Sequence, residues 1–240
     1  MIEVKNLSKN FGHQKALDSI SFVAHAGVVT GFLGPNGAGK TTTMKVLLGL
    51  ISSDSGTAYI DGRPFGKSPN PSRTASGLLD SKAALGSRKA KDHLLAVAEA
   101  NNIAKDRITY VLELVGLKND AKRQIRTFSL GMYQRLGIAE ALLGDPHNLI
   151  LDEPMNGLDP EGIKWIRDLL RQLAKAGKTI FLSSHILSEV QQTVDDLVII
   201  SKGRVVKTGK LSEINQGFSS LEEAFISLTD DNSNIEYKAG

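Results

Sequence analysis

The feature that most constrains this sequence is a cluster of glycines between two segments with regular periodicity. Five of the 23 glycines lie within residues 27–39. Residues 28–33 read Val-Val-Thr-Gly-Phe-Leu and predict a buried strand, whereas residues 41–50 carry apolar side chains at helical spacing and predict a helix that ends near Gly49. The predicted order is therefore a buried strand, a glycine loop and a helix.

The loop has the pattern G-x-x-x-x-G-K-T. It consists of Gly34, Pro35, Asn36, Gly37, Ala38, Gly39, Lys40 and Thr41. Small residues let successive backbone N–H groups converge, and a helix N-terminus adds partial positive charge, so the pattern predicts a phosphate-binding loop. We expect Lys40 to reach the β- and γ-phosphates of a nucleotide and the Thr41 hydroxyl to bind Mg²⁺. Thr42, the next residue, is also expected at the nucleotide.

A second motif follows the aliphatic run 148–151, which ends in two carboxylates, Asp152 and Glu153. We expect Asp152 to hold the metal and Glu153 to polarise the attacking water as a general base. Lys40 and Asp152 are 112 residues apart, and the segment between them has helical periodicity. This predicts an inserted helical subdomain instead of a small GTPase, and the N-K-x-D motif of a guanine site is absent from the sequence.

The remaining periodicity predicts strands that alternate with helices. Aliphatic runs at 179–182 and 197–200 predict two more strands. Alternating segments at 2–5 and 17–23 predict strands before the loop. Helices are predicted over 163–174, over 129–143, and twice within 87–116. Alternating strands and helices indicate an α/β fold with a parallel sheet.

Composition excludes several classes of protein. The longest uncharged stretch, 26–39, is shorter than the ~18 apolar residues of a membrane helix and contains five glycines, so no membrane-spanning segment is expected. No secretory signal is visible at the N-terminus. The absence of cysteine rules out disulfides and thiolate metal sites and suits a reducing compartment. A net charge of +3 is too small to indicate nucleic-acid binding.

Residues 128–135, Phe-Ser-Leu-Gly-Met-Tyr-Gln-Arg, resemble the signature motif of ABC transporter ATPases, which usually reads L-S-G-G-Q. The resemblance extends over residues 1–229, because further motifs occur in the order of that family. It implies a P-loop NTPase with a mostly parallel sheet core, an N-terminal antiparallel β subdomain and a helical subdomain at about 82–145. Residues 230–240 are expected to form a polar tail.

The same resemblance implies roles for residues outside the first two motifs. Phe11 is expected to stack on adenine, and Ser129 and Gly131 to contact phosphate. Asp159 lies in a motif that resembles the D-loop, which touches the opposite subunit, and His185 stands in the position of the switch histidine. In the family the signature motif of one subunit closes over the ATP of the other. A head-to-tail dimer of identical chains is therefore expected.

The sequence departs from the family pattern in two places. Asp80 aligns with the glutamine that binds Mg²⁺ in the family, and we expect it to be a metal ligand. Leu130 and Met132 replace the usual glycine and glutamine of the signature, which leaves only backbone contacts to phosphate at these two positions.

The resemblance implies an ATP-hydrolysing subunit that uses ATP and Mg²⁺ and powers a separate transmembrane permease. Such a subunit lies on the cytoplasmic face of the membrane and is held there by the permease. Residues 78–94, 156–162 and 183–189 resemble ATPases of bacterial drug, bacitracin and lantibiotic exporters. The alternative is a soluble ABC ATPase that acts on nucleic acid or the ribosome, but those relatives usually carry two ATPase units or a long coiled coil. A module that binds ATP without turnover would not need Glu153 and His185.

Overall fold

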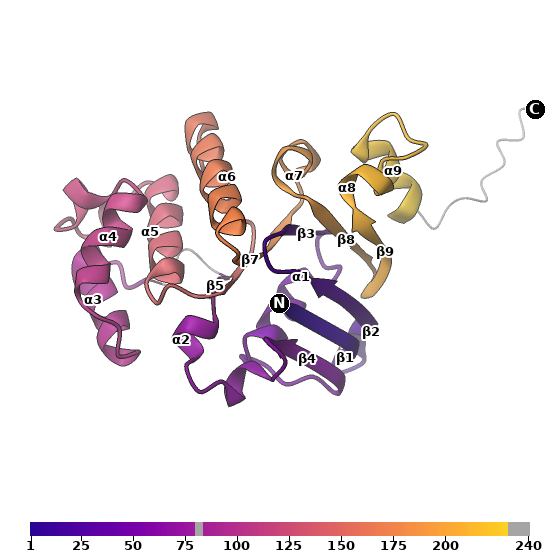
Figure 1. Cartoon of the computed structure of the whole chain (residues 1–240), viewed down its shortest axis with the longest axis horizontal. Helices are drawn as coiled ribbons and strands as arrows, with labels where there is room; N and C mark the ends of the chain where they lie inside the picture. Colours follow the sequence, from indigo (N-terminus) through magenta and orange to yellow (C-terminus); the bar gives the residue numbers. More distant parts are fainter. Residues whose placement is uncertain (80–83, 230–240) are drawn as a thin grey trace, which may run out of the picture.

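The computed structural model describes residues 1–79 and 84–229. Near the N-terminus, a three-stranded antiparallel sheet has the order β2-β1-β4 (Figure 1). Its strands are β1 (Ile2–Phe11), β2 (Gln14–Ala24) and β4 (Ser55–Ile60). The strands predicted at 2–5 and 17–23 are confirmed, and both extend beyond the predicted residues. The expected polar tail, 230–240, and Asp80 lie outside the described residues.

The larger sheet has six strands in the described part of the chain, in the order β5-β6-β7-β3-β8-β9. They are β3 (Val29–Leu33), β5 (Ala75–Leu78), β6 (Asn148–Leu151), β7 (Thr179–Ser184), β8 (Asp196–Ser201) and β9 (Arg204–Lys210). Each neighbouring pair is parallel except β8 and β9. The predicted parallel sheet is confirmed. Sequence reasoning missed β5, which has only four residues, and the largely polar edge strand β9.

The register of this sheet brings the predicted motifs to one edge. Leu33 at the end of β3 pairs with Ser184 of β7, and Leu151 at the end of β6 pairs with Leu182 of β7. Because parallel strands point the same way, the segments that follow β3, β6 and β7 emerge together. Ligands of open α/β sheets bind at this edge, outside the carboxyl ends of the strands.

Helix α1 (Lys40–Leu47) follows the glycine loop directly. Gly49 adopts φ +67°, and its N–H donates to Val46 O at 3.0 Å while the Leu50 N–H donates to Lys45 O at 2.9 Å. This pair of bonds is a Schellman motif, which uses glycine because the left-handed conformation carries no Cβ penalty there. The helix therefore ends near Gly49, as predicted.

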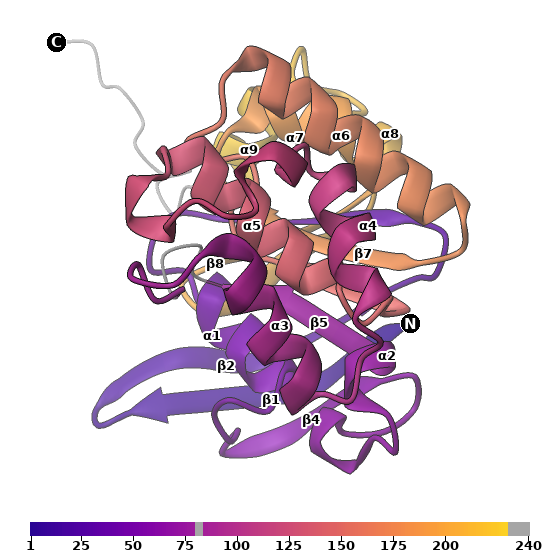
Figure 2. The same cartoon turned by 90° about the vertical axis from the view of Figure 1, so that its left-hand side faces the viewer.

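The chain between β5 and β6 is helical over much of its described length. It forms α3 (Ala90–Ala100), α4 (Asp106–Leu114) and α5 (Leu130–Leu142), with 3-10 turns at Lys118–Asp120 and Ile125–Thr127. The three helices lie together at one end of the molecule (Figures 1 and 2). The helices predicted within 87–116 and over 129–143 are confirmed. The division of the chain at about 82 and 145 stays a prediction.

The other helices are α2 (Pro71–Thr74), α6 (Pro160–Lys175), α7 (Leu187–Thr193), α8 (Leu211–Ile214) and α9 (Leu221–Thr229), with one further 3-10 turn at Phe65–Lys67. Helix α6 covers the predicted segment 163–174, and it begins earlier because Asp159 caps it and Pro160 occupies its first turn. Within the described ranges, no helix is both long enough and apolar enough to span a membrane.

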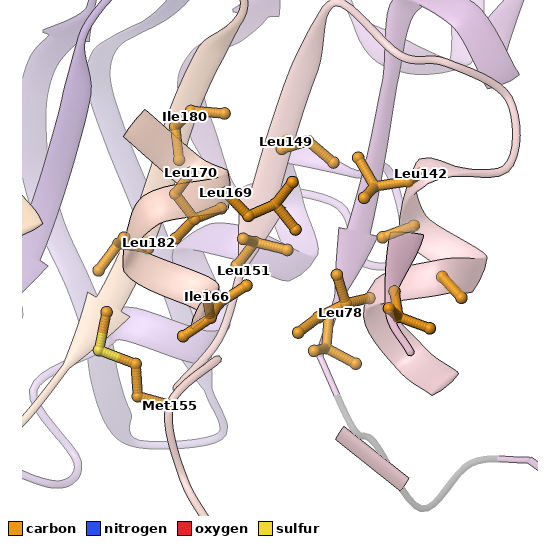
Figure 3. Packing of buried hydrophobic residues seen from close by; sticks show 14 of the residues in the cluster. Leu78, Leu142, Leu149, Leu151, Met155, Ile166, Leu169, Leu170, Ile180 and Leu182 are labelled. Atoms are coloured by element: carbon orange, nitrogen blue, oxygen red, sulfur yellow. The ribbon is translucent and has the colours of Figure 1, made fainter. Parts of the chain in front are cut away.

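Two hydrophobic clusters cover the opposite faces of the larger sheet. Successive strand residues alternate between them: Leu149, Leu151, Ile180 and Leu182 belong to the cluster under the helices, whereas Ile150 and Phe181 belong to the cluster under the antiparallel sheet. Figure 3 shows the first cluster, in which Ile166, Leu169 and Leu170 of α6 lie against β6 and β7. The alternation follows from the two-residue period of a strand.

Three phenylalanine rings connect the two sheets. Phe22 of β2, Phe32 of β3 and Phe181 of β7 have ring centroids 5.2–5.4 Å apart. Phe32 and Phe181 are completely buried, and Phe22 is 6% exposed. Aromatic pairs at this separation add to the free energy gained by burial. The rings therefore fix the antiparallel sheet, and Phe11 at the end of β1, relative to the glycine loop.

We expect Phe181→Ala to lower the free energy of unfolding by about 3–5 kcal/mol, because it removes a buried ring that contacts two others. Urea unfolding followed by circular dichroism measures the change. Val206→Ala on β9 is the control, since this side chain is partly exposed and its truncation should change stability by less than about 0.5 kcal/mol. A loss below about 1 kcal/mol for Phe181→Ala would contradict the proposed role of the rings.

Candidate nucleotide site

A cleft of about 340 Å³ lies at the edge where the predicted motifs emerge. It is lined by Phe11, Gln14, Ala16, Asn36, Gly37, Gly39, Lys40, Thr41, Thr42, Asp152 and Glu153. The cleft thus joins the antiparallel sheet, the glycine loop, α1 and the end of β6. Phe11 is 52% exposed, so its ring presents a free apolar face beside the loop.

The backbone of the loop requires glycine at specific positions. Gly37 and Gly39 adopt φ +80° and +109°, and Gly39 is the N-cap of α1. A Cβ at Gly34 would overlap the carbonyl oxygen of Ile200 on β8. Left-handed backbone and close approach of this kind are the two conditions under which glycine is the favoured residue. The loop can therefore turn its N–H groups toward the cleft while it packs against the sheet.

Lys40 is the buried cation of the cleft, with only 7% of its surface exposed. Its ammonium donates to the carbonyl oxygens of Gly34 at 2.6 Å and Pro35 at 3.1 Å. Burial lowers the pKa of Lys40, and the negative charges of Glu153 and Asp152 oppose that shift. A partly desolvated ammonium held on the loop interacts strongly with a phosphate, since less water screens it.

Hard oxygen groups converge on Asp152. The Thr41 hydroxyl donates to Asp152 Oδ2 at 2.6 Å, and the Ser183 hydroxyl donates to Oδ1 at 2.5 Å. Hydroxyl and carboxylate oxygens are the ligands that Mg²⁺ prefers. The donor set on α1 and β6 therefore fits this ion. The third predicted ligand, Asp80, lies outside the described residues.

Glu153 is held from several sides in an uncommon backbone conformation. Its φ of +50° is rare for a residue other than glycine. Its N–H donates to Ser183 Oγ at 2.9 Å, and its carbonyl accepts from Gln134 Nε2 at 3.1 Å. The carboxylate lies 2.9 Å from His185 Nδ1. Backbone strain held by such contacts concentrates at functional sites.

The predicted signature and D-loop residues form a second cluster apart from the cleft. Ser129 caps α5 and accepts from the Met132 N–H at 3.3 Å, and Asp159 caps α6 and accepts from the Gly162 N–H at 2.8 Å. A Cβ on Gly131 would lie 3.3 Å from the Gly157 carbonyl, so the starts of the two helices are adjacent. None of Ser129, Gly131 and Asp159 lines the cleft.

Sequence reasoning assigned no role to Ser183, Gln134, Gln14 or Ala16. Ser183 contacts both Asp152 and the backbone of Glu153, and Gln134 contacts Glu153 from α5. Ser183 stands at the end of an aliphatic strand and two residues before His185. This position in the sequence could have indicated that Ser183 belongs to the site. Gln14 and Ala16 belong to β2 and reach the cleft only because the two sheets pack together.

Comparison with known proteins agrees with this geometry. The sequence pattern of the family described as "ABC transporter" matches residues 17–156. The bacitracin transport ATP-binding protein BcrA of Bacillus licheniformis is 46% identical over 210 residues, which cover 86% of this chain and 69% of that protein. The lantibiotic transport ATP-binding protein SrtF of Streptococcus pyogenes is 38% identical, over 94% of this chain and 96% of that protein.

Solved structures show the same fold. An ATP-binding subunit of an ABC transporter superposes with a TM-score of 0.87 at 30% identity, covering 96% of this chain and 100% of that one. A dimeric ATP-binding cassette bound to ADP and phosphate superposes with a TM-score of 0.79 at 22% identity, over 88% of this chain and 99% of that one. The chain belongs to the ABC transporter family and is an ATP-binding subunit with transport-coupled ATPase activity. These relatives support transport and not action on nucleic acid.

We expect Ser183→Ala to lower ATP turnover by about 10-fold to 100-fold, because Asp152 and the backbone of Glu153 both lose a partner. A phosphate-release assay with varied Mg²⁺ should show that more Mg²⁺ is needed for half-maximal activity. Ser188→Ala, an exposed serine on α7, is the control and should match the wild type. Equal Mg²⁺ dependence of both variants would contradict a supporting role for Ser183.

Proposed function

We propose that the cleft binds Mg²⁺–ATP and that Glu153 is the general base of its hydrolysis. The observation that carries this proposal is the pair of contacts at the end of β6, where Asp152 joins the Thr41 hydroxyl and Glu153 joins His185. One carboxylate is thereby directed to the metal position and the next to the position of the attacking water. The phosphates bind the loop N–H groups and Lys40, and adenine stacks on Phe11.

The chemistry requires a proton acceptor for water and stabilisation of the charge on the transferred phosphoryl group. Glu153 accepts the proton, and its contact with His185 at 2.9 Å keeps the carboxylate from rotating away. Mg²⁺, when bound through Thr41 and Asp152, neutralises charge on the β- and γ-phosphates. Lys40 supplies a second positive charge from the loop.

The second cluster requires a second copy of the chain. Ser129 and Gly131 lie at the start of α5 and outside the cleft of their own chain. The start of a 13-residue helix favours an anion, because its N–H groups lack partners within the helix. A head-to-tail homodimer places this cluster over the ATP of the partner subunit. ATP then holds the two subunits together, and hydrolysis releases them.

We expect Glu153→Gln to bind ATP but to lower the rate of phosphate release by about 10²–10⁴-fold, since the amide cannot accept the proton. With ATP and Mg²⁺ the variant should also elute as a dimer in size-exclusion chromatography and as a monomer without nucleotide. Glu222→Gln on α9 changes an exposed carboxylate and is the control. Turnover at the wild-type rate would remove Glu153 as the base, and a monomer at all ATP concentrations would contradict the dimer.

A separate groove supports docking of a permease. It has a volume of about 630 Å³ and lies between the segment that follows α1, strand β5 and the helices α2, α3 and α5. Its walls include the apolar side chains of Leu48, Leu50, Phe65, Leu79, Ala84, Val97 and Ile103. Leu50 is 63% exposed, the largest exposed fraction among the large apolar side chains of the described residues, and it adjoins the other apolar side chains of the groove. We propose that a helical segment of a separate membrane permease binds here and holds the subunit at the cytoplasmic face of the membrane.

The proposed cargo is a drug, peptide antibiotic or other amphiphile that is exported from a bacterial cell. The relatives that support this class carry bacitracin and lantibiotic transport in their names. The sequence runs 156–162 and 183–189 point to the same class. These names support a class of cargo and not one compound.

We expect Leu50→Glu to prevent co-purification with the proposed permease, because it places a charge in the apolar groove. Resistance of the cells to bacitracin and to a lantibiotic should fall with it, while ATP turnover of the isolated subunit stays within twofold of the wild type. Tyr110→Glu on α4 is the control, since Tyr110 is also about half exposed but lies outside the groove. Unchanged co-purification would contradict docking at this groove.

A further inference from the structure

The ring of Phe11 stands at the tip of a hairpin that extends beyond its neighbouring strand. The pairing of β1 with β4 ends at Ser8, which lies opposite Ser55, whereas the pairing of β1 with β2 continues to Phe11, which lies opposite Gln14. The ring is 52% exposed. Two-stranded hairpins are marginally stable in water. The hairpin alone therefore leaves the position of the ring weakly determined.

One carboxylate, that of Asp54, holds this tip from the residue before β4. Its Oδ2 accepts from the Asn10 N–H at 2.6 Å and from Asn10 Nδ2 at 2.9 Å, and its Oδ1 accepts from Lys9 Nζ at 3.0 Å. The Asp54 N–H donates in turn to the Ser8 carbonyl at 2.9 Å. The side chain of Asp54 thus stands beside β1 where a longer β4 would continue the sheet.

The contacts made by this carboxylate are charge-assisted. The hydrogen bond from Lys9 holds the pKa of Asp54 below its ordinary value, the Asn10 N–H lowers it further, and desolvation acts in the opposite direction. Asp54 is therefore ionised at neutral pH. Hydrogen bonds to an ionised group are stronger than those between neutral groups, so the three contacts of Asp54 restrain the tip of the hairpin.

Lys9 connects this carboxylate to the ring of Phe11. Its ammonium lies over the ring at 5.6 Å from the centroid, within the range of a cation–π contact. Phe11 lines the nucleotide cleft and Lys9 does not, so the ammonium approaches the ring from outside the cleft. The side chain of Lys9 is only 14% exposed, because it is enclosed between its partners. The side of the ring toward the cleft stays open.

We propose that Lys9 and Asp54 are positioning residues for Phe11. The Asp54 carboxylate holds the tip of the hairpin, and the Lys9 ammonium holds the ring so that adenine stacks on its cleft side. Asp54 lies shortly after α1, which begins at Lys40, so the segment that carries the phosphate-binding lysine also fixes the ring. The base and the phosphates are thereby held at a set separation. This inference rests on the proposed stacking of adenine on Phe11.

Mg²⁺–ADP reaches both the loop and Phe11, whereas Mg²⁺–pyrophosphate has no base and reaches only the loop. Isothermal titration calorimetry with the full chain measures both dissociation constants without turnover. We expect Phe11→Ala to weaken ADP binding about fivefold to 150-fold, the range for stacking of one base. Lys9→Met should weaken it about twofold to fivefold, and Asp54→Ala about twofold to tenfold. Pyrophosphate binding should stay unchanged in all three variants.

A double-mutant cycle shows whether the two residues act through the ring. In a Phe11→Ala background, Lys9→Met and Asp54→Ala should have no further effect on ADP binding. Lys9→Arg keeps the cation and should bind ADP as the wild type does. Lys5→Met is the matched control, because Lys5 is an ion-paired lysine at the other end of β1, with its ammonium 2.8 Å from Glu3.

Wild-type affinity for ADP in either Lys9→Met or Asp54→Ala overturns the proposal. An equal loss of ADP and pyrophosphate binding does so too, because it shows a disturbed loop, as does further weakening in the Phe11→Ala background. Lys9→Met removes no backbone contact and keeps the test decisive where Asp54→Ala does not fold. Unchanged ADP binding in Phe11→Ala contradicts the stacking of adenine itself and this inference with it, whereas a loss in Phe11→Ala alone contradicts only the positioning.

Discussion

The site depends on the hydrogen bonds that Asp152 accepts from two other segments. Thr41 reaches Asp152 from α1, and Ser183 reaches it from β7, while the chain of Asp152 itself continues β6. One carboxylate thus connects the glycine loop, the second motif and the strand that leads to His185. Those three segments come close only because β3, β6 and β7 are neighbours in one parallel sheet. The proposed ion site therefore depends on the order of the strands in this sheet.

Three unusual backbone conformations lie at the same edge. Gly37 and Gly39 adopt left-handed φ values because the loop must turn its N–H groups inward, and Glu153 does so without being glycine. Its conformation is maintained by Ser183 on one side and Gln134 on the other. Gln134 lies on α5, within the helices inserted between β5 and β6, so a movement of these helices would act directly on Glu153. This contact offers a physical route between the groove proposed for permease docking and the proposed base.

The proposed cycle follows from the separation between the cleft and the cluster of Ser129, Gly131 and Asp159. In the proposed cycle, each chain carries a site for the phosphates and a second anion site apart from its own cleft. In that cycle, ATP bound by one chain also contacts the second chain.

The sequence by itself determined the phosphate loop, the two carboxylates, the helix that starts at Ser129 and the parallel α/β class. Each of these is a local pattern, in which a glycine, a cap or a short periodic run dictates the backbone of its own segment. It did not reveal β5, β9 or Ser183, which take their roles from residues far along the chain. Tertiary structure decided which predicted residues meet: Phe11 lies beside the loop because the two sheets pack together, whereas Ser129 and Asp159 do not line the cleft. Strand order and burial are properties of the whole chain, and no local pattern encodes them.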